Sequence, residues 1–350
     1  MATINDVSKR AGVSNATVSR VLNNNLQVDA ELRRRVLQAI KELEFIPNSS
    51  ARSLKTKRTE RIALVIPDIT NPFFPEVARG AQDTLDSAGF HLFLCNTDGN
   101  RERESRYLRN LARAGIDGLI ITPSIAQGEL GTRSHASRMT LAQELDALGV
   151  PIVGIAPESV TSSADSVTID EERAAFQATS HLLGLGHIRV ALINGPQDSW
   201  VANRRQRGFE AALRERHITA DPALMEVGFF RRDGGHAAMH RVLTHDLTAV
   251  FAANDLMALG ALAALHEAGR RVPDDVALVS IDNIIEAAES DPGLSTVAIP
   301  RNYEHGRVAA QLLLDRLQGS GDTSGPPRRV ELDTRLIVRG STVKGVTGYL

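Results

Sequence analysis

The stretch "VSNATVSRVLNNN", residues 13–25, has the apolar spacing of a helix but the composition of a weak helix former. Its polar positions hold short Ser, Thr and Asn side chains, which compete for backbone hydrogen bonds and destabilise a helix interior. The helically spaced apolar residues are Val13, Ala16, Val18, Val21 and Leu22. We therefore expect a short helix from Ser14 to about Leu22 that persists only because Val18, Val21 and Leu22 pack against neighbouring helices.

Two further short helices flank this stretch. Thr3 can cap the first, with Asp6 three residues later, and the "AGV" turn at 11–13 separates it from the second. Asp29 can cap a third helix. The buried face of that third helix is expected to hold Leu32, Val36, Leu37, Ile40 and Leu43. Residues 1–47 therefore read as a three-helix domain.

The charge of the chain is unevenly distributed. Residues 1–60 contain eleven Lys and Arg against six Asp and Glu, whereas the remaining residues contain 29 against 36. A basic arm on an acidic body is typical of nucleic-acid binding. The alternative is a solvated helix face that carries Arg33, Arg34 and Arg35.

From Arg61 onward, apolar runs of strand length alternate with helix-length amphipathic segments. The runs are 62–68, 90–98, 118–124, 151–156, 189–195, 249–255 and 276–282. Continuous apolar strands separated by helices predict doubly wound parallel α/β sheets. A length of 350 residues and a hydrophobic content of 42% allow two such subdomains, each with its own core.

The chain divides on this reading into three parts. Residues 1–47 are expected to form the three-helix domain, the polar and basic segment 48–60 a linker, and 61–345 the core. We expect the first core subdomain to contain about 61–160 and 292–324, and the second about 161–291 and 325–345, with more than one crossing of the chain between them.

Polar residues follow several of the predicted strands, in "DITNPFF" (68–74), "NGPQDSW" (194–200) and at Asn254 and Asp282. The carboxyl ends of parallel strands meet at one edge of a sheet, where ligands bind. Amide and carboxylate groups with a helix-borne Arg suit a carbohydrate or a similar polar molecule. Any one of these Asn and Asp residues could instead cap the following helix.

Enzyme and metal signatures are weak. Cys95 has no paired base and reads as a small buried side chain. "HAAMH" (236–240) places two His on one helix face without the Glu of a zinc protease motif, and reads as two partly exposed His. "GLGHIR" (184–189) precedes a strand, whereas a dinucleotide fingerprint follows one. We expect no catalytic activity, no cofactor and no metal.

The single Cys cannot form a disulfide within the chain, which predicts that the protein acts in the reducing cytoplasm. No apolar run approaches the ~20 residues that are needed to cross a bilayer. The start "MATINDVSKRAG" has no apolar signal-peptide core.

Several motifs identify a family when they are read together. They are "TINDVSKRAGVSNATVSRVLN" (3–23), "FIPNSSARSL" (45–54), "NPFF" (71–74), "RQRGF" (205–209), "AANDLMALGAL" (252–262), "DPGLSTV" (291–297) and "LDTRLIVRGST" (332–342). With them the chain resembles the lac repressor (LacI/GalR) family of bacterial transcription regulators over nearly its full length. The resemblance implies a helix-turn-helix domain, a hinge helix, and a periplasmic-binding-protein-like core of two doubly wound α/β subdomains.

The resemblance also implies which residues contact DNA. Asn15 and Ala16 fall on positions that read bases in the major groove, and Arg20 matches a base-reading Arg. Ala51 and Leu54 match hinge residues that enter the minor groove, where Leu54 would wedge between base pairs. The phosphate-contacting or register-setting positions are Thr3, Ser14, Thr17, Ser19, Asn23 and Asn48.

For the core, the resemblance implies an effector site between the subdomains. Arg205 and Asp282 are its principal residues, because a fork of donors and a carboxylate can hold vicinal hydroxyls. Trp200 could stack on a sugar ring or serve as a core or rim residue. The other implied residues are Asn71, Phe73, Phe74, Ser124, Phe230 and Asn254.

The function implied is that of a homodimeric repressor, or a dimer of dimers. It would bind a pseudo-palindromic operator, with its affinity controlled by a small effector such as a sugar or sugar derivative. The alternatives are a co-repressor-dependent regulator with a nucleobase-like ligand, a solute-binding module without DNA binding, and an α/β enzyme. Induction, in which the ligand weakens DNA binding, is expected over co-repression.

Overall fold

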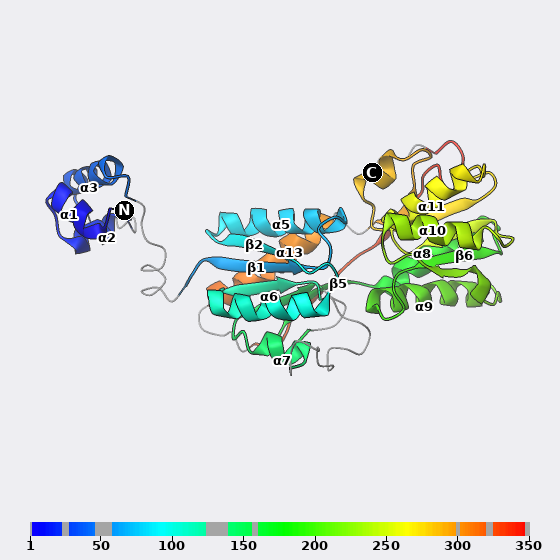
Figure 1. The fold of residues 1–350 in the computed structure, drawn as a ribbon, viewed down its shortest axis with the longest axis horizontal. Helices are drawn as coiled ribbons and strands as arrows, with labels where there is room; N and C mark the ends of the chain where they lie inside the picture. Colours follow the sequence, from blue (N-terminus) through cyan, green and yellow to red (C-terminus); the bar gives the residue numbers. More distant parts are fainter. Residues whose placement is uncertain are drawn as a thin grey trace. The chain divides into compact units, whose positions relative to one another are not determined.

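The computed structural model describes residues 2–22, 28–45, 58–123, 139–155, 160–298, 302–319 and 325–346. Tertiary contacts divide the chain into two compact units, Met1–Thr59 and Glu60–Leu350 (Figure 1). Within the described residues, no helix has the length and apolar character that crossing a membrane requires.

The first unit contains three helices, α1 (Ile4–Ala11), α2 (Asn15–Leu22) and α3 (Ala30–Glu42). Thr3 and Asp6 form a reciprocal capping box at the start of α1, and Asp29 caps α3 through two backbone N–H groups. The core contains Val7, Ala11, Val18, Val21, Val36, Ala39 and Phe45. The three-helix prediction is thus confirmed for the described residues.

Two predicted core positions of this unit are wrong. Leu37 is 52% exposed and Leu22 is 36% exposed, so neither belongs to the buried core. Val36 and Ala39 supply the contact of α3 instead. A helix buries only a stripe of its surface, and an apolar side chain next to that stripe remains in solvent.

The second unit contains two six-stranded sheets, each flanked by helices (Figure 1). The first sheet has the strand order β11-β5-β4-β3-β1-β2. Its strands are β1 (Arg61–Ile66), β2 (His91–Asn96), β3 (Gly118–Ile121), β4 (Ile152–Ile155), β5 (Asp165–Ile169) and β11 (Arg329–Leu332). Its helices are α5 (Phe73–Ser87), α6 (Arg101–Ala114), α7 (Leu141–Asp146) and α13 (Asn302–Gln318).

Alternate residues of β1 point to opposite faces of this sheet. Ile62, Leu64 and Ile66 pack with α5 and α13. Ala63 and Val65 pack with α6 and α7. Because both faces are covered by helices, β1 is a continuous apolar run, as is typical of a buried parallel strand.

The second sheet has the order β12-β10-β9-β8-β6-β7. Its strands are β6 (Val190–Asn194), β7 (Met225–Val227), β8 (Ala249–Ala252), β9 (Ala277–Ile281), β10 (Ser295–Ala298) and β12 (Arg335–Ile337). Its helices are α8 (Glu171–Gly184), α9 (Trp200–Glu215), α10 (Arg232–Val242), α11 (Asp255–Glu267) and the short α12 (Ile285–Glu289), with a 3-10 turn at Pro222–Leu224. Helices α8 and α9 cover one face, and α10 and α11 cover the other.

Each of the seven apolar runs contains a strand, which confirms the predicted α/β class. The predicted division of the strands between the subdomains is wrong at three places. β5 and β11 belong to the first sheet and β10 belongs to the second. The chain therefore passes from one sheet to the other three times, after β5, after β10 and after β11.

A buried carboxylate explains why β5 and β11 share a sheet. Asp165 accepts hydrogen bonds from the side chain of Arg316 and from both the backbone and the side chain of Arg328. Burial alone would raise the pKa of Asp165, but these hydrogen bonds outweigh it and hold that pKa below its usual value. Asp165 thus ties the start of β5 to α13 and to the residue preceding β11.

Candidate functional sites

The exposed face of α2 carries the residues that the sequence assigns to base reading. Asn15, Ala16 and Arg20 are exposed, Thr17 and Ser19 are half-buried, and Val18 and Val21 are buried. Packing of the two valines holds a helix whose own propensity is poor. The arrangement presents a row of small polar groups and one guanidinium to solvent.

Three of the predicted DNA-contacting residues also have local structural roles. Thr3 belongs to the capping box of α1. The Ser14 hydroxyl accepts a hydrogen bond from the Thr17 backbone N–H at 3.2 Å, so it caps α2. The Asn15 amide donates to the Asn5 side chain at 2.6 Å. These contacts orient the polar side chains at the start of α2.

Five predicted site residues lie outside the described part of the chain. They are Asn23, Asn48, Ala51, Leu54 and Ser124.

At the carboxyl edge of the second sheet, Arg205 of α9 is 5% exposed and contacts three acidic or carbonyl groups. Its Nε lies 2.7 Å from Glu171 Oε2, at the start of α8. Another guanidinium nitrogen donates to the backbone carbonyl of Ala253, directly after β8. The third lies 3.5 Å from Asp282 Oδ1, directly after β9. Arg205 therefore joins the ends of two strands to α8.

The electrostatics of this cluster leave Asp282 poorly compensated. Its buried carboxylate lies 3.5 Å from the Arg205 guanidinium, whereas the Glu171 carboxylate lies 2.7 Å from the same guanidinium. Burial raises the pKa of Asp282 to about 8 against the opposing effect of Arg205. Asp282 also has a φ of 118°, a region that favours glycine and that non-glycine residues occupy mainly at functional sites.

Behind Asp282, a second buried carboxylate binds the strand ends together. Asp255 accepts hydrogen bonds from the Ser280 and Thr296 hydroxyls and from the Ile284 backbone N–H. Burial raises the pKa of Asp255 to about 6. Sequence reasoning did not include Asp255 or Glu171 among the site residues, although the polar pair "ND" at 254–255 and the acidic pair "EE" at 171–172 each follow a strand.

Asn254 has the helix-capping role that the sequence left open. Its side chain accepts from the Met257 backbone N–H at 3.0 Å and donates to the Phe230 carbonyl at 3.2 Å. Phe230 has a φ of 59°, and its ring lies against the backbone of Gly195, where a Cβ would collide with it. Asn254 therefore fixes the Phe230 loop next to the end of β6.

The predicted residues of the first sheet lie at the start of α5. Asn71 accepts a hydrogen bond from the Phe73 backbone N–H at 3.1 Å and so starts the helix. Phe74 is 8% exposed and packs in the core, whereas Phe73 is partly buried. The Phe73 ring lies 5.5 Å from the His305 ring, between ring centroids.

His305, which is 2% exposed, makes the stability of this region pH-dependent. Burial lowers its pKa to about 4, so the folded protein keeps it neutral while the unfolded chain binds a proton below pH ~6.5. Its contribution is complete above pH ~6.5 and is lost as the pH falls toward 4, at up to about 1.4 kcal/mol per pH unit. Chemical denaturation across this pH range should show that the free energy of unfolding falls more steeply with falling pH for the wild type than for His305→Gln. The same pH dependence in both proteins would contradict this role of His305.

Two cavities lie in the second unit. Trp200, whose ring lies 4.9 Å from the Arg204 guanidinium, lines a cavity of about 180 Å³. The other residues that line it are Thr168, Ile169, Asp170, Glu171, Arg204, Arg329 and Glu331. Glu171 therefore contacts Arg205 and also borders the Trp200 cavity.

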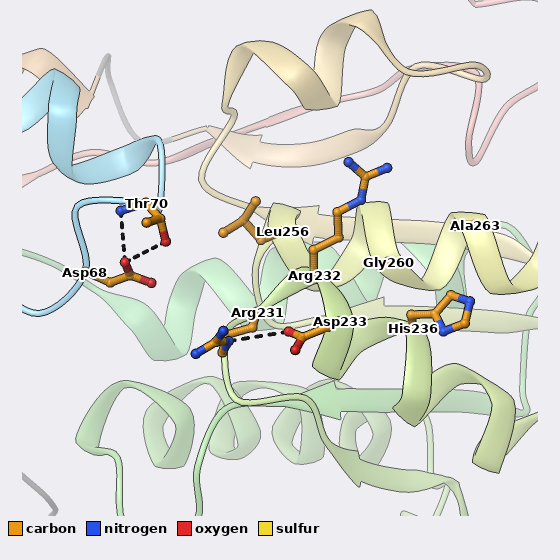
Figure 2. A pocket seen from close by; sticks show the side chains of 9 residues that line it. All are labelled: Asp68, Thr70, Arg231, Arg232, Asp233, His236, Leu256, Gly260 and Ala263. Carbon is orange, nitrogen blue, oxygen red and sulfur yellow. Dashed lines mark hydrogen bonds and ion pairs between the residues drawn. The ribbon is translucent and has the colours of Figure 1, made fainter. Parts of the chain in front are cut away.

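The larger cavity, of about 580 Å³, lies between the loop after β1 and the helices α10 and α11. In Figure 2, Asp68 and Thr70 lie on one side, and Arg231, Asp233 and His236 lie on the other. None of the described residues predicted to contact the effector lines this cavity. The two cavities are thus lined by different sets of residues.

Comparison with known proteins agrees with this architecture. Residues 3–48 match the family described as bacterial regulatory proteins, lacI family, and residues 179–342 match a periplasmic binding protein-like domain. The ribose operon repressor of Halalkalibacterium halodurans is 37% identical over 99% of this chain and 98% of its own length. The chain belongs to the LacI family.

Other LacI-family proteins are similar over most of the chain. The transcriptional repressor PurR of Aliivibrio fischeri is 33% identical over 98% of this chain and 99% of its own. A structure of the regulator CelR with cellobiose covers 97% of this chain and 100% of its own, at 35% identity and a TM-score of 0.70. A structure of the lac repressor dimer bound to operator covers 98% of this chain and 99% of its own, at 26% identity and a TM-score of 0.81.

A LacI-family regulator from Enterococcus faecium with bound ribose covers 81% of this chain and 99% of its own, at 33% identity and a TM-score of 0.71. The protein is therefore a DNA-binding transcription regulator of the LacI family and not an enzyme, as the sequence predicted.

Proposed function

We propose that the protein is a homodimeric repressor, acting in the cytoplasm, whose affinity for a pseudo-palindromic operator is controlled by a carbohydrate effector. The observation that carries the effector half of this proposal is the buried Arg205–Asp282 contact at the strand ends. Asp282 sits at 3.5 Å from a guanidinium that is already close to Glu171. A pair of vicinal hydroxyls can donate to Asp282 and accept from Arg205, which compensates a carboxylate that burial disfavours.

The similar structures support a sugar over other polar ligands, since one is described with cellobiose and another with ribose. Trp200, on the first turn of α9, is proposed to stack on a sugar ring. The remaining proposed effector contacts are Asn71, Phe73, Phe74, Ser124, Phe230 and Asn254.

The DNA half of the proposal rests on α2. Asn15, Ala16 and Arg20 are its exposed residues near the helix start and on the following turn, where a recognition helix meets base edges. Asn can pair with adenine, Arg with guanine, and Ala can contact a thymine methyl group. Thr3, Ser14, Thr17, Ser19, Asn23 and Asn48 are proposed to contact phosphates or to set the register.

Homodimer formation is supported by apolar side chains on the edge of the first sheet. β2 is an edge strand on which Phe93 is 48% exposed and Leu94 is 43% exposed. An exposed apolar edge strand favours association with another chain. Ile285 of α12, which is 67% exposed, is proposed to extend the interface in the second subdomain. Sedimentation equilibrium should give a dimer for the wild type and a monomer for Phe93→Glu; a dimer in both would contradict this interface.

A screen of ligands by thermal shift tests the effector class. At about 100 times its dissociation constant, a ligand stabilises the folded state by about 2.7 kcal/mol, which raises Tm by several degrees. We expect such a shift with a pentose such as ribose or a disaccharide such as cellobiose. A shift with adenine or guanine and with neither sugar would replace the carbohydrate with the nucleobase-like alternative.

The hinge assignment has its own test. Replacing Leu54 with Ala removes the side chain proposed to wedge between base pairs at the operator centre. Specific operator affinity should fall at least tenfold while the effector-induced thermal shift stays unchanged. Equal operator affinity of the wild type and Leu54→Ala would contradict the wedge.

A further inference from the structure

Two histidines of α10 and a glutamate of α11 meet at the surface of the second subdomain. His236 Nε2 lies 2.9 Å from Glu267 Oε2, and His240 Nε2 lies 3.2 Å from the same oxygen. One potential ligand atom from each residue lies within 4.8 Å of the others. The sequence placed the two histidines on one helix face but gave no third ligand; the fold supplies Glu267 from the next helix.

We propose that His236, His240 and Glu267 form a binding site for a divalent transition metal with the preferences of Zn²⁺. Two imidazole nitrogens and one carboxylate oxygen are ligands that Zn²⁺ favours. In a tetrahedral zinc site with ligands about 2.0–2.1 Å from the metal, neighbouring ligand atoms stand roughly 3.3 Å apart. The two nitrogen–oxygen separations are already close to this value, and all three ligand atoms lie within 4.8 Å of one another.

The scaffold of this site is rigid because the backbones of α10 and α11 touch. A Cβ on Gly260 would collide with the Arg232 carbonyl oxygen, and a Cβ on Gly235 would collide with the Met257 backbone. The glycines therefore set the separation of the two helices. Helices that are held this closely keep the ligands of one within reach of the ligand of the other.

The charge state of the site also suits a cation. The Glu267 carboxylate faces both imidazoles and supplies the anionic ligand of the set. The three side chains are 35%, 46% and 58% exposed, which leaves the ion open to solvent. Metal binding would replace the two contacts between the imidazole Nε2 atoms and Glu267.

Three protein ligands leave a fourth coordination position. His236 also lines the cavity of about 580 Å³, at its edge away from Asp68 and Thr70 (Figure 2). The fourth position is therefore available to water or to an oxygen atom of a molecule in that cavity.

Titration of the full-length, chelator-treated protein with Zn²⁺ by calorimetry tests the site, and the visible absorption of bound Co²⁺ reports its geometry. We expect one ion per chain and the intense absorption of four-coordinate Co²⁺. His236→Ala, His240→Ala and Glu267→Gln should each weaken Zn²⁺ binding at least tenfold. His266→Ala is the matched control, because this exposed histidine adjoins Glu267 and belongs to no ligand set, and it should bind as the wild type does.

A thermal shift provides a second readout that does not depend on DNA or sugar. Zn²⁺ should raise Tm for the wild type and for His266→Ala, and should leave it unchanged for His240→Ala. Equal Zn²⁺ affinity in the wild type and in all three ligand variants would overturn the site, as would Co²⁺ spectra of six-coordinate ions alone.

Discussion

Replacing Arg205 with Ala is expected to abolish the thermal shift caused by the effector and to lower the free energy of unfolding of the core by about 3–5 kcal/mol. The substitution removes the guanidinium that is proposed to donate to the sugar, and it leaves the largely buried carboxylates of Glu171 and Asp282 without their shared cation. Chemical denaturation and the ligand thermal shift measure the two effects on the same sample.

Two further variants separate ligand binding from folding. Arg207 lies on the exposed face of the same helix, and Arg207→Ala should change neither quantity by more than about 0.5 kcal/mol. Asp282→Asn keeps the shape of the side chain and leaves Arg205 paired with Glu171, so it should fold but bind the sugar at least tenfold more weakly. An effector response retained by Asp282→Asn and by Arg205→Ala would place the effector elsewhere.

Replacing Arg20 with Ala is expected to lower operator affinity by about 1–3 kcal/mol per half-site, which is at least 30-fold for a dimer that uses both half-sites. The reason is the loss of a guanidinium that can pair with guanine from the exposed face of α2. Binding to a panel of operator duplexes, each with one altered base pair, measures both the affinity and the preference at each position.

The way in which the affinity loss is distributed over the duplexes distinguishes base reading by Arg20 from contact with a phosphate. Arg20→Ala should erase the preference at one base pair of each half-site. The control, Arg34→Ala, removes an exposed charge on α3 that pairs with Glu31 at 2.6 Å, and should weaken all duplexes slightly and equally. A uniform loss with Arg20→Ala would assign Arg20 to phosphate contact.

The elements of the fold were largely predictable because their signals are local. Thr3 with Asp6 and the unbroken apolar run of β1 each depend on residues close together in the sequence. Which of the two sheets each strand joins was not predictable in the same way. β10 and β11 are four-residue strands that could join either sheet, and contacts such as those of Asp165 with Arg316 and Arg328 decide between them.

The candidate sites show the same limit. Arg205 and Asp282 were predicted through the family resemblance, and the structure brings them together. The partner that holds Arg205 in place, Glu171, lies 34 residues away in the chain, on another helix. Likewise, His236 and His240 share a helix face that the sequence reveals, whereas Glu267 comes from a separate helix. Groups that meet only through tertiary packing leave no periodic signal.

A single ligand-binding event in the core is expected to change the operator affinity of the protein. An operator is first selected from random duplex DNA, and its dissociation constant is then measured by fluorescence anisotropy at fixed salt, with and without the sugar that raises Tm. We expect saturating sugar to change this constant by about 5- to 150-fold, a coupling free energy of about 1–3 kcal/mol. An operator dissociation constant that stays the same while the sugar still raises Tm would contradict the claim.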